Sequence, residues 1–179
     1  MKKLLFTIAI GLVGMTAQAQ TNFKWDEVDS ISKTKTELYS LTKMYIAETW
    51  KSAQDVIQND DKDGGMILVK GVSIQKPFYQ MHTHNLVFSY SVKFLFKDNK
   101  YRIIIENVYC QSHRVEVYDW ALMPVADTYP TEKGLRITTT NEEKYLEIMA
   151  SLRNELQLIV DGYELYLKNN KGVTTNHDW

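Results

Sequence analysis

The sequence lacks most of the features from which a function is usually inferred. It has one cysteine, Cys110, in 179 residues, which excludes an internal disulfide, and we expect Cys110 to be a small buried apolar residue. It contains none of the short strings typical of serine hydrolases, zinc proteases, dinucleotide-binding proteins or P-loop proteins. Its acidic residues are scattered, and none forms a recognisable acid–base pair. The sequence therefore offers no catalytic residue and no cofactor site, and we predict that the protein is not an enzyme.

The chain also lacks an excess of charge of either sign. Removing Lys2 and Lys3 from the 21 basic residues leaves 19 against 22 acidic residues, a net charge of −3. Proteins that bind nucleic acid usually carry a basic patch, so we expect no nucleic-acid partner. The hydrophobic fraction of 44% and the aromatic fraction of 12% indicate a folded globular protein.

Only the N-terminal segment carries a long hydrophobic run. Lys2 and Lys3 precede the apolar stretch 4–15, and Ala17-Gln18-Ala19 follows it, which is the pattern of a secretory signal peptide. No second run of that length follows, and no cysteine lies just after Ala19 to carry a lipid. We therefore expect cleavage after residues 1–19, no membrane-spanning segment, and a protein that is soluble in the periplasm or secreted.

Two helices are expected on either side of a strand-rich region. Thr34 and Glu37 are spaced as a capping box, and a helix is predicted from there to about Ser52. A second capping box starts at Thr140, and an apolar seam at helical spacing then continues to about Lys168. We predict one α+β domain over residues 20–168 and a mobile tail over residues 169–179.

A long β-hairpin gives the clearest pattern. Apolar residues alternate strictly through Leu86, Phe88, Tyr90, Val92, Phe94 and Phe96, as in a strand with one buried face. A two-residue turn at Asp98-Asn99 would pair residues whose numbers sum to 197, so that Phe94 faces Ile103 and Phe88 faces Tyr109. Because strands of this length are unusual, we also expect a bulge or a strong bend.

The remaining strands are shorter. Extended segments are predicted at residues 23–31, 55–59 and 66–74, and residues 118–139 are expected to be irregular. The element order is therefore strand, helix, four strands, helix.

Several segments resemble a known family of exported proteins from Gram-negative bacteria. The similarity lies in Ser32–Tyr39, Trp50, Val56–Gln58, Asp60–Ile67, Lys70-Gly71 and Lys97–Arg102, and it covers about residues 31–118. That family is described as a domain of unknown function with a TATA-binding-protein-like (TBP-like) fold. The resemblance implies a curved antiparallel sheet with two helices on one face, in the order β-α-β-β-β-β-α, and it implies no catalytic residue.

Three histidines form a weak candidate for a metal site. In the predicted register His84 lies opposite His113, and His82 points to the same side. Cross-strand imidazoles can bind zinc or copper. No third strong ligand or supporting shell is evident, so we expect these histidines to cap the end of the hairpin and no metal to be bound.

The face of the hairpin opposite the predicted core carries more apolar residues than a fully hydrated face would. We therefore predict an interaction surface there, formed by Val87, Leu95, Arg102, Ile104 and Val108.

The leading hypothesis is a non-catalytic exported binding module, or one associated with the cell envelope. Its partner would be a protein, a small ligand or a second copy of the chain. The alternatives are a small metalloprotein or hydrolase that uses His84 and His113, and a structural component of an envelope assembly.

Overall fold

A sheet covered on one face by two helices makes up the computed structural model, which describes residues 23–50, 52–79, 82–83, 85–113, 120–126, 128–129 and 141–170. The predicted signal peptide and residues 171–179 lie outside the described residues. Along the chain the elements are β1 (Trp25–Ser30), α1 (Lys35–Thr49), α2 (Ala53–Val56), β2 (Ile57–Asp61), β3 (Met66–Gln75), β4 (Phe78–Tyr79), β5 (His82–Thr83), β6 (Leu86–Lys97), β7 (Lys100–His113), β8 (Trp120–Pro124) and α3 (Glu142–Asn169).

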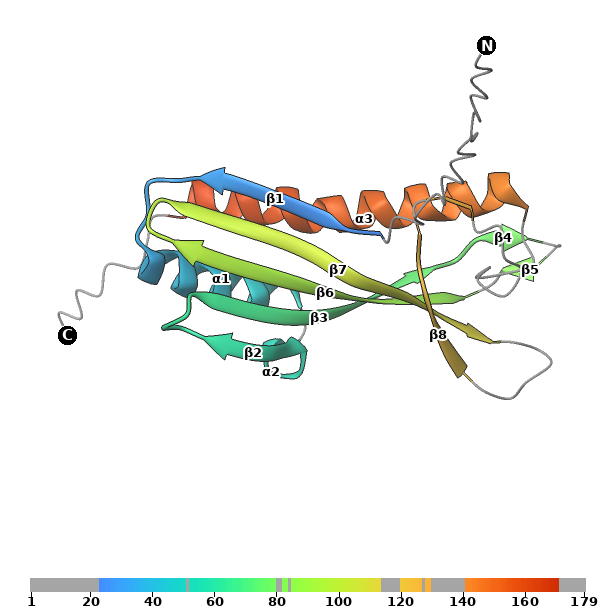
Figure 1. Cartoon of the computed structure of the whole chain (residues 1–179), viewed down its shortest axis with the longest axis horizontal. Helices are drawn as coiled ribbons and strands as arrows, with labels where there is room; N and C mark the ends of the chain where they lie inside the picture. The colour runs from blue at the N-terminus through green and yellow to red at the C-terminus, as the bar shows by residue number, and fades with distance from the viewer. Residues whose placement is uncertain are drawn as a thin grey trace, which may run out of the picture.

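The main sheet is antiparallel, with the strand order β1-β7-β6-β3-β2 (Figure 1). β8 pairs with β7 beyond the end of β1. The main-chain N–H of Phe23 donates to the carbonyl of Val125, and the N–H of Val125 donates to the carbonyl of Val108, both at 3.0 Å. β1 and β8 therefore follow one another along the same side of β7. β8 lies within residues 118–139, for which the sequence predicts an irregular segment, so that prediction is wrong for residues 120–124.

The N-terminus of α1 is fixed by its own capping box and by the hairpin tip. The Thr34 side chain accepts a hydrogen bond from the Glu37 main-chain N–H, and the Glu37 carboxylate accepts one from the Thr34 N–H at 2.7 Å. Asp98 in the turn between β6 and β7 accepts a further bond from the Lys35 N–H at 2.8 Å. Because free N–H groups at a helix start require acceptors, the turn both closes the hairpin and secures the helix.

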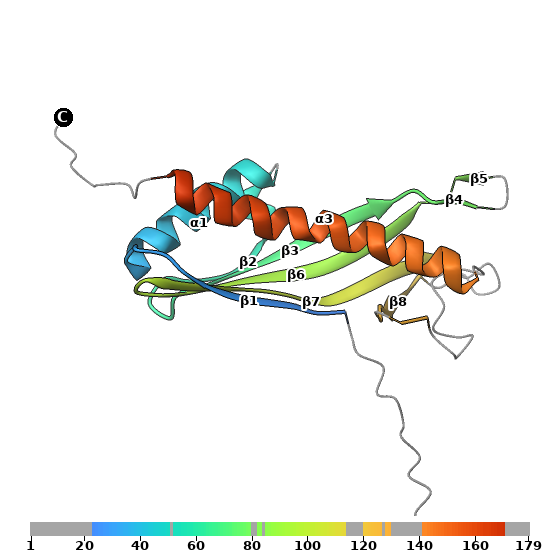
Figure 2. The same cartoon turned by 90° about the horizontal axis from the view of Figure 1, so that it is seen from above.

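The helix α3 runs the length of the sheet, on the same face as α1 (Figure 2). It begins one residue later than predicted, because Asn141 is its N-cap and accepts from the Lys144 N–H at 3.0 Å. The buried hydroxyls of Thr42 and Tyr163 lie 2.6 Å apart and connect α1 to α3. A residue larger than glycine at position 162 would approach the Tyr45 hydroxyl to 3.2 Å, so Gly162 permits close helix packing.

The predicted hairpin register is confirmed from the turn to the pair Ser91–Glu106 and is wrong beyond it. One extra residue on β7 shifts the pairing, so that Phe88 faces Cys110 and not Tyr109. Asn107 has φ 56°, a left-handed conformation that asparagine adopts more readily than most residues. This β-bulge reverses which residues of β7 face the helices.

The core lies between the sheet and the two helices. Its buried side chains include Phe88, Phe94 and Ile103 from the sheet and Leu152 and Tyr163 from α3. The α+β fold with two main helices on one face of an antiparallel sheet is confirmed. We call the face toward the helices the inner face and the opposite one the outer face.

Candidate interaction surface

Four of the five predicted interaction residues lie on the outer face, and the fifth does not. Val87 and Leu95 are half-buried, Arg102 is exposed and Ile104 is 7% exposed. Val108 is 4% exposed and belongs to the hydrophobic core. Its prediction as an outer-face residue is wrong, because the bulge at Asn107 moves every later residue of β7 to the other face.

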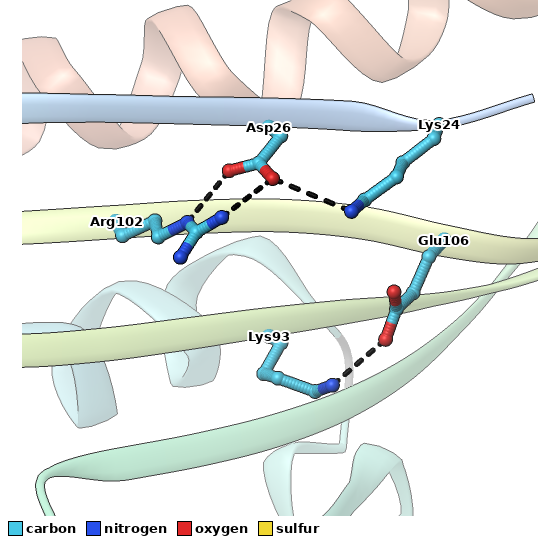
Figure 3. A network of polar contacts seen from close by, with 5 residues as sticks. All are labelled: Lys24, Asp26, Lys93, Arg102 and Glu106. Carbon is cyan, nitrogen blue, oxygen red and sulfur yellow. Dashed lines mark hydrogen bonds and ion pairs between the residues drawn. The ribbon is translucent and has the colours of Figure 1, made fainter.

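Five charged residues cross the outer face of β1, β7 and β6, and we call them the charged ladder: Lys24, Asp26, Lys93, Arg102 and Glu106. Arg102 donates two hydrogen bonds to Asp26, from Nε at 2.6 Å and from a terminal nitrogen at 2.7 Å, and Lys24 lies 3.4 Å from the same carboxylate. Lys93 donates to Glu106 at 2.7 Å. Figure 3 shows both groups side by side on neighbouring strands.

The contact with Arg102 makes the Asp26 carboxyl more acidic than usual. The two hydrogen bonds from Arg102, and then the proximity of Lys24, lower the pKa of Asp26 to about 2. A bidentate arginine–carboxylate pair is the strongest geometry for such a contact. The Arg102–Asp26 pair therefore stays ionised at neutral pH, and the Asp26 carboxylate is not available there as a proton donor.

The charged ladder surrounds Ile104. Across the strands Ile104 pairs with Asp26 on β1 and with Lys93 on β6, and Arg102 and Glu106 are its neighbours two positions away on β7. The aliphatic parts of long charged side chains commonly cover apolar surface, which accounts for the low exposure of Ile104 on an open sheet face. Ile104 is thus a covered residue and is not available to a partner.

Two neighbouring exposed apolar residues of the outer face lie along β3, apart from Val28 on β1, which is 55% exposed. Val72 is 61% exposed and Ile74 is 54% exposed. In the register of the sheet Ile74 pairs with the half-buried Val87 of β6. We call Val72, Ile74 and Val87 the β3 patch. Large β-branched residues exposed together on a sheet face are typical of a contact surface.

The β3 patch borders an open edge of the sheet. β2 pairs with β3 only over residues 66–69, so within the described part of the chain no strand pairs with residues 70–75 on that side. The Phe96 N–H donates to the Gly65 carbonyl at 2.8 Å. Because paired residues in an antiparallel ladder alternate in their hydrogen bonding, odd-numbered residues of β3 bond to β6. The N–H and C=O groups of Lys70, Val72 and Ile74 therefore point outward from the edge.

A polar cluster lies on the inner face beside this edge, where α3 crosses β3, and we call it the inner polar cluster: Ser73, Gln75, Ser151 and Glu155. One oxygen of Glu155, Oε2, accepts from Ser73 Oγ at 2.7 Å and from Gln75 Nε2 at 2.6 Å. Ser151 donates to the Gln75 carbonyl oxygen at 2.7 Å. Ser73 is 1% exposed. No cationic side chain among the described residues forms an ion pair with Glu155.

An acidic cleft of about 410 Å³ lies between β1 and α3, and its lining includes Glu27, Asp29, Tyr101 and Glu164. Its carboxylates already have partners. Glu27 accepts from the Trp25 indole N–H at 2.6 Å, and Asp29 lies 3.4 Å from the Tyr101 hydroxyl. Glu164 pairs with Lys168. Burial, and then the nearby Asp29, raises the pKa of Tyr101, so this hydroxyl stays protonated.

The predicted histidine group falls largely outside the described part of the structure, which gives no side chain for any of its three members. The backbone of His82 lies in β5, and that of His113 lies in β7 opposite Trp120 of β8. His84 lies outside the described residues, and the register that placed it opposite His113 does not hold beyond the bulge. Within the described residues no group of three or more metal-ligating side chains converges.

Cys110 is fully buried in the core, as predicted. Burial raises the pKa of its thiol to about 12. The thiol therefore stays protonated near neutral pH and cannot act as a nucleophile there.

Sequence reasoning missed both the β3 patch and the inner polar cluster. The signal for each was the alternation in β3, where Ser73 and Gln75 occupy the same phase as the buried Ile67 and Val69. A polar residue at a buried phase indicates a polar partner from another element. The opposite phase carries Val72 and Ile74, which the alternation assigns to the outer face.

The fold described above is that of a TBP-like α+β domain. Residues 25–111 match the family described as a domain of unknown function (DUF4468) with TBP-like fold. This part of the chain belongs to that family, as the resemblance implied. No protein with a curated description matches the sequence.

Two crystal structures are similar to this chain. One is a TBP-like protein from Parabacteroides distasonis, with 14% identity and a TM-score of 0.61, over 84% of this chain and 95% of that protein. The other is a DUF4468 family protein from Bacteroides ovatus, with 12% identity and a TM-score of 0.59, over 85% of this chain and 89% of that protein. At these identities the likeness establishes the fold alone. Of the helices in the described part of this chain, none has the length and apolar character needed to cross a bilayer.

Proposed function

We propose that the chain is a non-catalytic binding module that is exported from the cytoplasm, as a single domain over residues 20–168. Its binding surface is the β3 patch on the outer face, and its partner is a protein. The N-terminal pattern of two lysines, an apolar stretch and Ala17-Gln18-Ala19 supports export. The pKa of Asp26 is lowered by Arg102 and the pKa of the Cys110 thiol is raised by burial, so neither group is suited to proton transfer or nucleophilic attack at neutral pH, which favours binding over catalysis.

One observation carries the binding proposal. Val72 and Ile74 expose 61% and 54% of their surface on the outer face, and they are two of the six residues 70–75 that form the open strand edge. Edge strands in soluble proteins are usually protected by charge, proline or a covering element. Here the edge strand carries exposed β-branched side chains, and a partner that covered them would gain free energy from the burial of their apolar surface.

Site-specific photocrosslinking in the native host tests the binding surface. The photoreactive residue p-benzoyl-phenylalanine is placed at Ile74, and in a matched control at Leu158, which is 69% exposed on α3. We expect a discrete protein adduct at Ile74 and none at Leu158. Equal adducts at both positions, or none at Ile74, would contradict the proposed surface.

Mass spectrometry of the protein from its native host tests export. We expect an N-terminus at or near Gln20, because cleavage follows the small residues of the signal. A chain that retains Met1, or one that carries a lipid at its N-terminus, would contradict the proposed route.

A further inference from the structure

The open edge of β3 has the geometry to bind a particular kind of partner. We propose that residues 70–75 bind an extended peptide segment as an additional antiparallel strand, with apolar side chains on its outer side and a basic side chain directed to Glu155. This inference rests on the proposed function and names the partner class and its mode of binding.

The backbone supplies the first argument. The N–H and C=O groups of Lys70, Val72 and Ile74 point away from β6, and no described residue pairs with them. An added strand satisfies all of them at once, which is the basis of strand addition at sheet edges. A folded partner that offers only side chains, because its own main-chain hydrogen bonds are already formed, would leave these N–H and C=O groups without main-chain partners.

The side chains of β3 define what the peptide must carry. Residues of an added strand that bond to Val72 and Ile74 have their own side chains on the outer face, next to exposed valine and isoleucine. Residues between them have side chains on the inner face, within about 5 Å of Ser73. The peptide should therefore alternate, with β-branched apolar residues in one phase.

Glu155 determines which side chains suit the alternate peptide positions, those that face the inner side of the sheet. Its Oε2 accepts from Ser73 and Gln75, whereas no hydrogen bond from the described residues reaches Oε1. A lysine of the peptide opposite Ser73 can reach this carboxylate and supply the missing cation. A second copy of the chain fits less well, because edge-to-edge pairing would place the Glu155 carboxylates of both copies on one side of the joint sheet with no cation between them.

Binding of synthetic heptapeptides to the purified chain, measured by fluorescence anisotropy, tests the backbone argument. The first probe alternates valine and lysine. N-methylation of the valines should abolish binding, because in an antiparallel pair with Val72 and Ile74 the valine N–H groups donate to β3. N-methylation of the lysines, whose N–H groups point away, is the matched control and should leave binding within about threefold. Equal affinity of the two methylated peptides would overturn the proposal.

Two substitutions in the chain test the same geometry independently. Val72→Pro removes an N–H group that points away from β6, so the sheet should accept proline at this edge position. The substitution should abolish peptide binding. Val72→Ala is the matched control, because it retains the N–H group. Glu155→Gln should weaken the valine–lysine peptide on the order of tenfold, with little effect on a valine–threonine peptide. Unchanged affinity in Val72→Pro or in Glu155→Gln would overturn strand addition or the role of Glu155, respectively.

The outcomes separate this inference from the proposed function. If the adduct at Ile74 in cells persists in Val72→Pro, the surface binds a partner but not as a strand, and strand addition is wrong. If no adduct forms at Ile74 in the original chain, the proposed function itself fails. Sedimentation that shows a concentration-dependent dimer abolished by Val72→Pro would assign the edge to a second copy and overturn the peptide proposal.

Discussion

Replacement of Ile104 by alanine should destabilise the domain far more than the same change at Val72, although both residues lie on the outer face. Ile104 is 7% exposed, so Ile104→Ala removes three nearly buried carbon atoms and should lower the free energy of unfolding by about 2.5 kcal/mol. Val72 is 61% exposed, and Val72→Ala should cost only about 0.5 kcal/mol. Urea denaturation at neutral pH measures both values, and an unchanged m-value shows that only stability has changed.

The charged ladder should be the cause of this difference. In an Arg102→Ala background Ile104 loses part of its cover, so Ile104→Ala should then cost less, with a coupling of about 0.5–1 kcal/mol. If Ile104→Ala lowers the free energy of unfolding by less than about 1 kcal/mol, the ladder does not bury this side chain. If the cost is large but unaffected by Arg102→Ala, the side chain is buried by something other than the guanidinium.

Three further predictions concern charge, the bulge and the thiol. The fold lowers the pKa of Asp26 from its ordinary value of 3.8 to about 2, so the contribution of Asp26 to stability is present above about pH 4 and is lost as the pH falls toward 2. Asp26→Asn should lower the free energy of unfolding by about 0.5–1 kcal/mol at neutral pH and should have no effect once the carboxyl is protonated. Denaturation of both proteins across that pH range measures the difference. Val108→Lys should unfold the domain, whereas Leu95→Lys should leave its circular dichroism spectrum unchanged, and two folded variants would contradict the bulge. Cys110 should resist a thiol reagent in the native protein and react only at the rate of global unfolding, and rapid labelling at neutral pH would contradict its burial.

Local chemistry made much of the fold predictable. The capping box at Thr34 depends on side chains and backbone groups within four residues, and the turn at Asp98-Asn99 depends on two. The hairpin register then followed from the alternation of apolar residues, and it is confirmed up to the pair Ser91–Glu106. The family resemblance supplied the sheet and helix arrangement that these local patterns support but do not specify.

The position of the bulge was harder to predict, because it depends on one residue that departs from the pattern. Asn107 is a polar residue at a phase that the alternation assigned to the core, and its left-handed φ restores the burial of Val108 and Cys110. Sequence alone allows a bulge anywhere along a long hairpin. Asn107, a polar residue at a position that the alternation assigns to the core, was the signal for the bulge. Without the bulge, the alternation places Val108 on the wrong face of the sheet.

The candidate surface was predicted only in part for a related reason. Whether an alternating strand exposes a face to solvent or to a neighbour depends on pairings between distant segments. Val72 and Ile74 lie in a strand that the sequence predicted, but their exposure results from the early end of β2 and the open edge beyond Val69. Val87, Leu95 and Arg102 lie on the predicted face, and their role in binding stays a prediction.

The position of α3 has a consequence for the order in which the protein can fold. Its residues Tyr145 to Leu167 supply a large part of the core, and they are made after every strand of the sheet. In a chain that emerges from its N-terminus onward, whether from a ribosome or through a translocation channel, α1 can already contact Phe94 through Tyr45, but the part of the inner face that packs against α3 must stay uncovered until the last helix is released. The core would therefore be completed late, when α3 docks on the sheet.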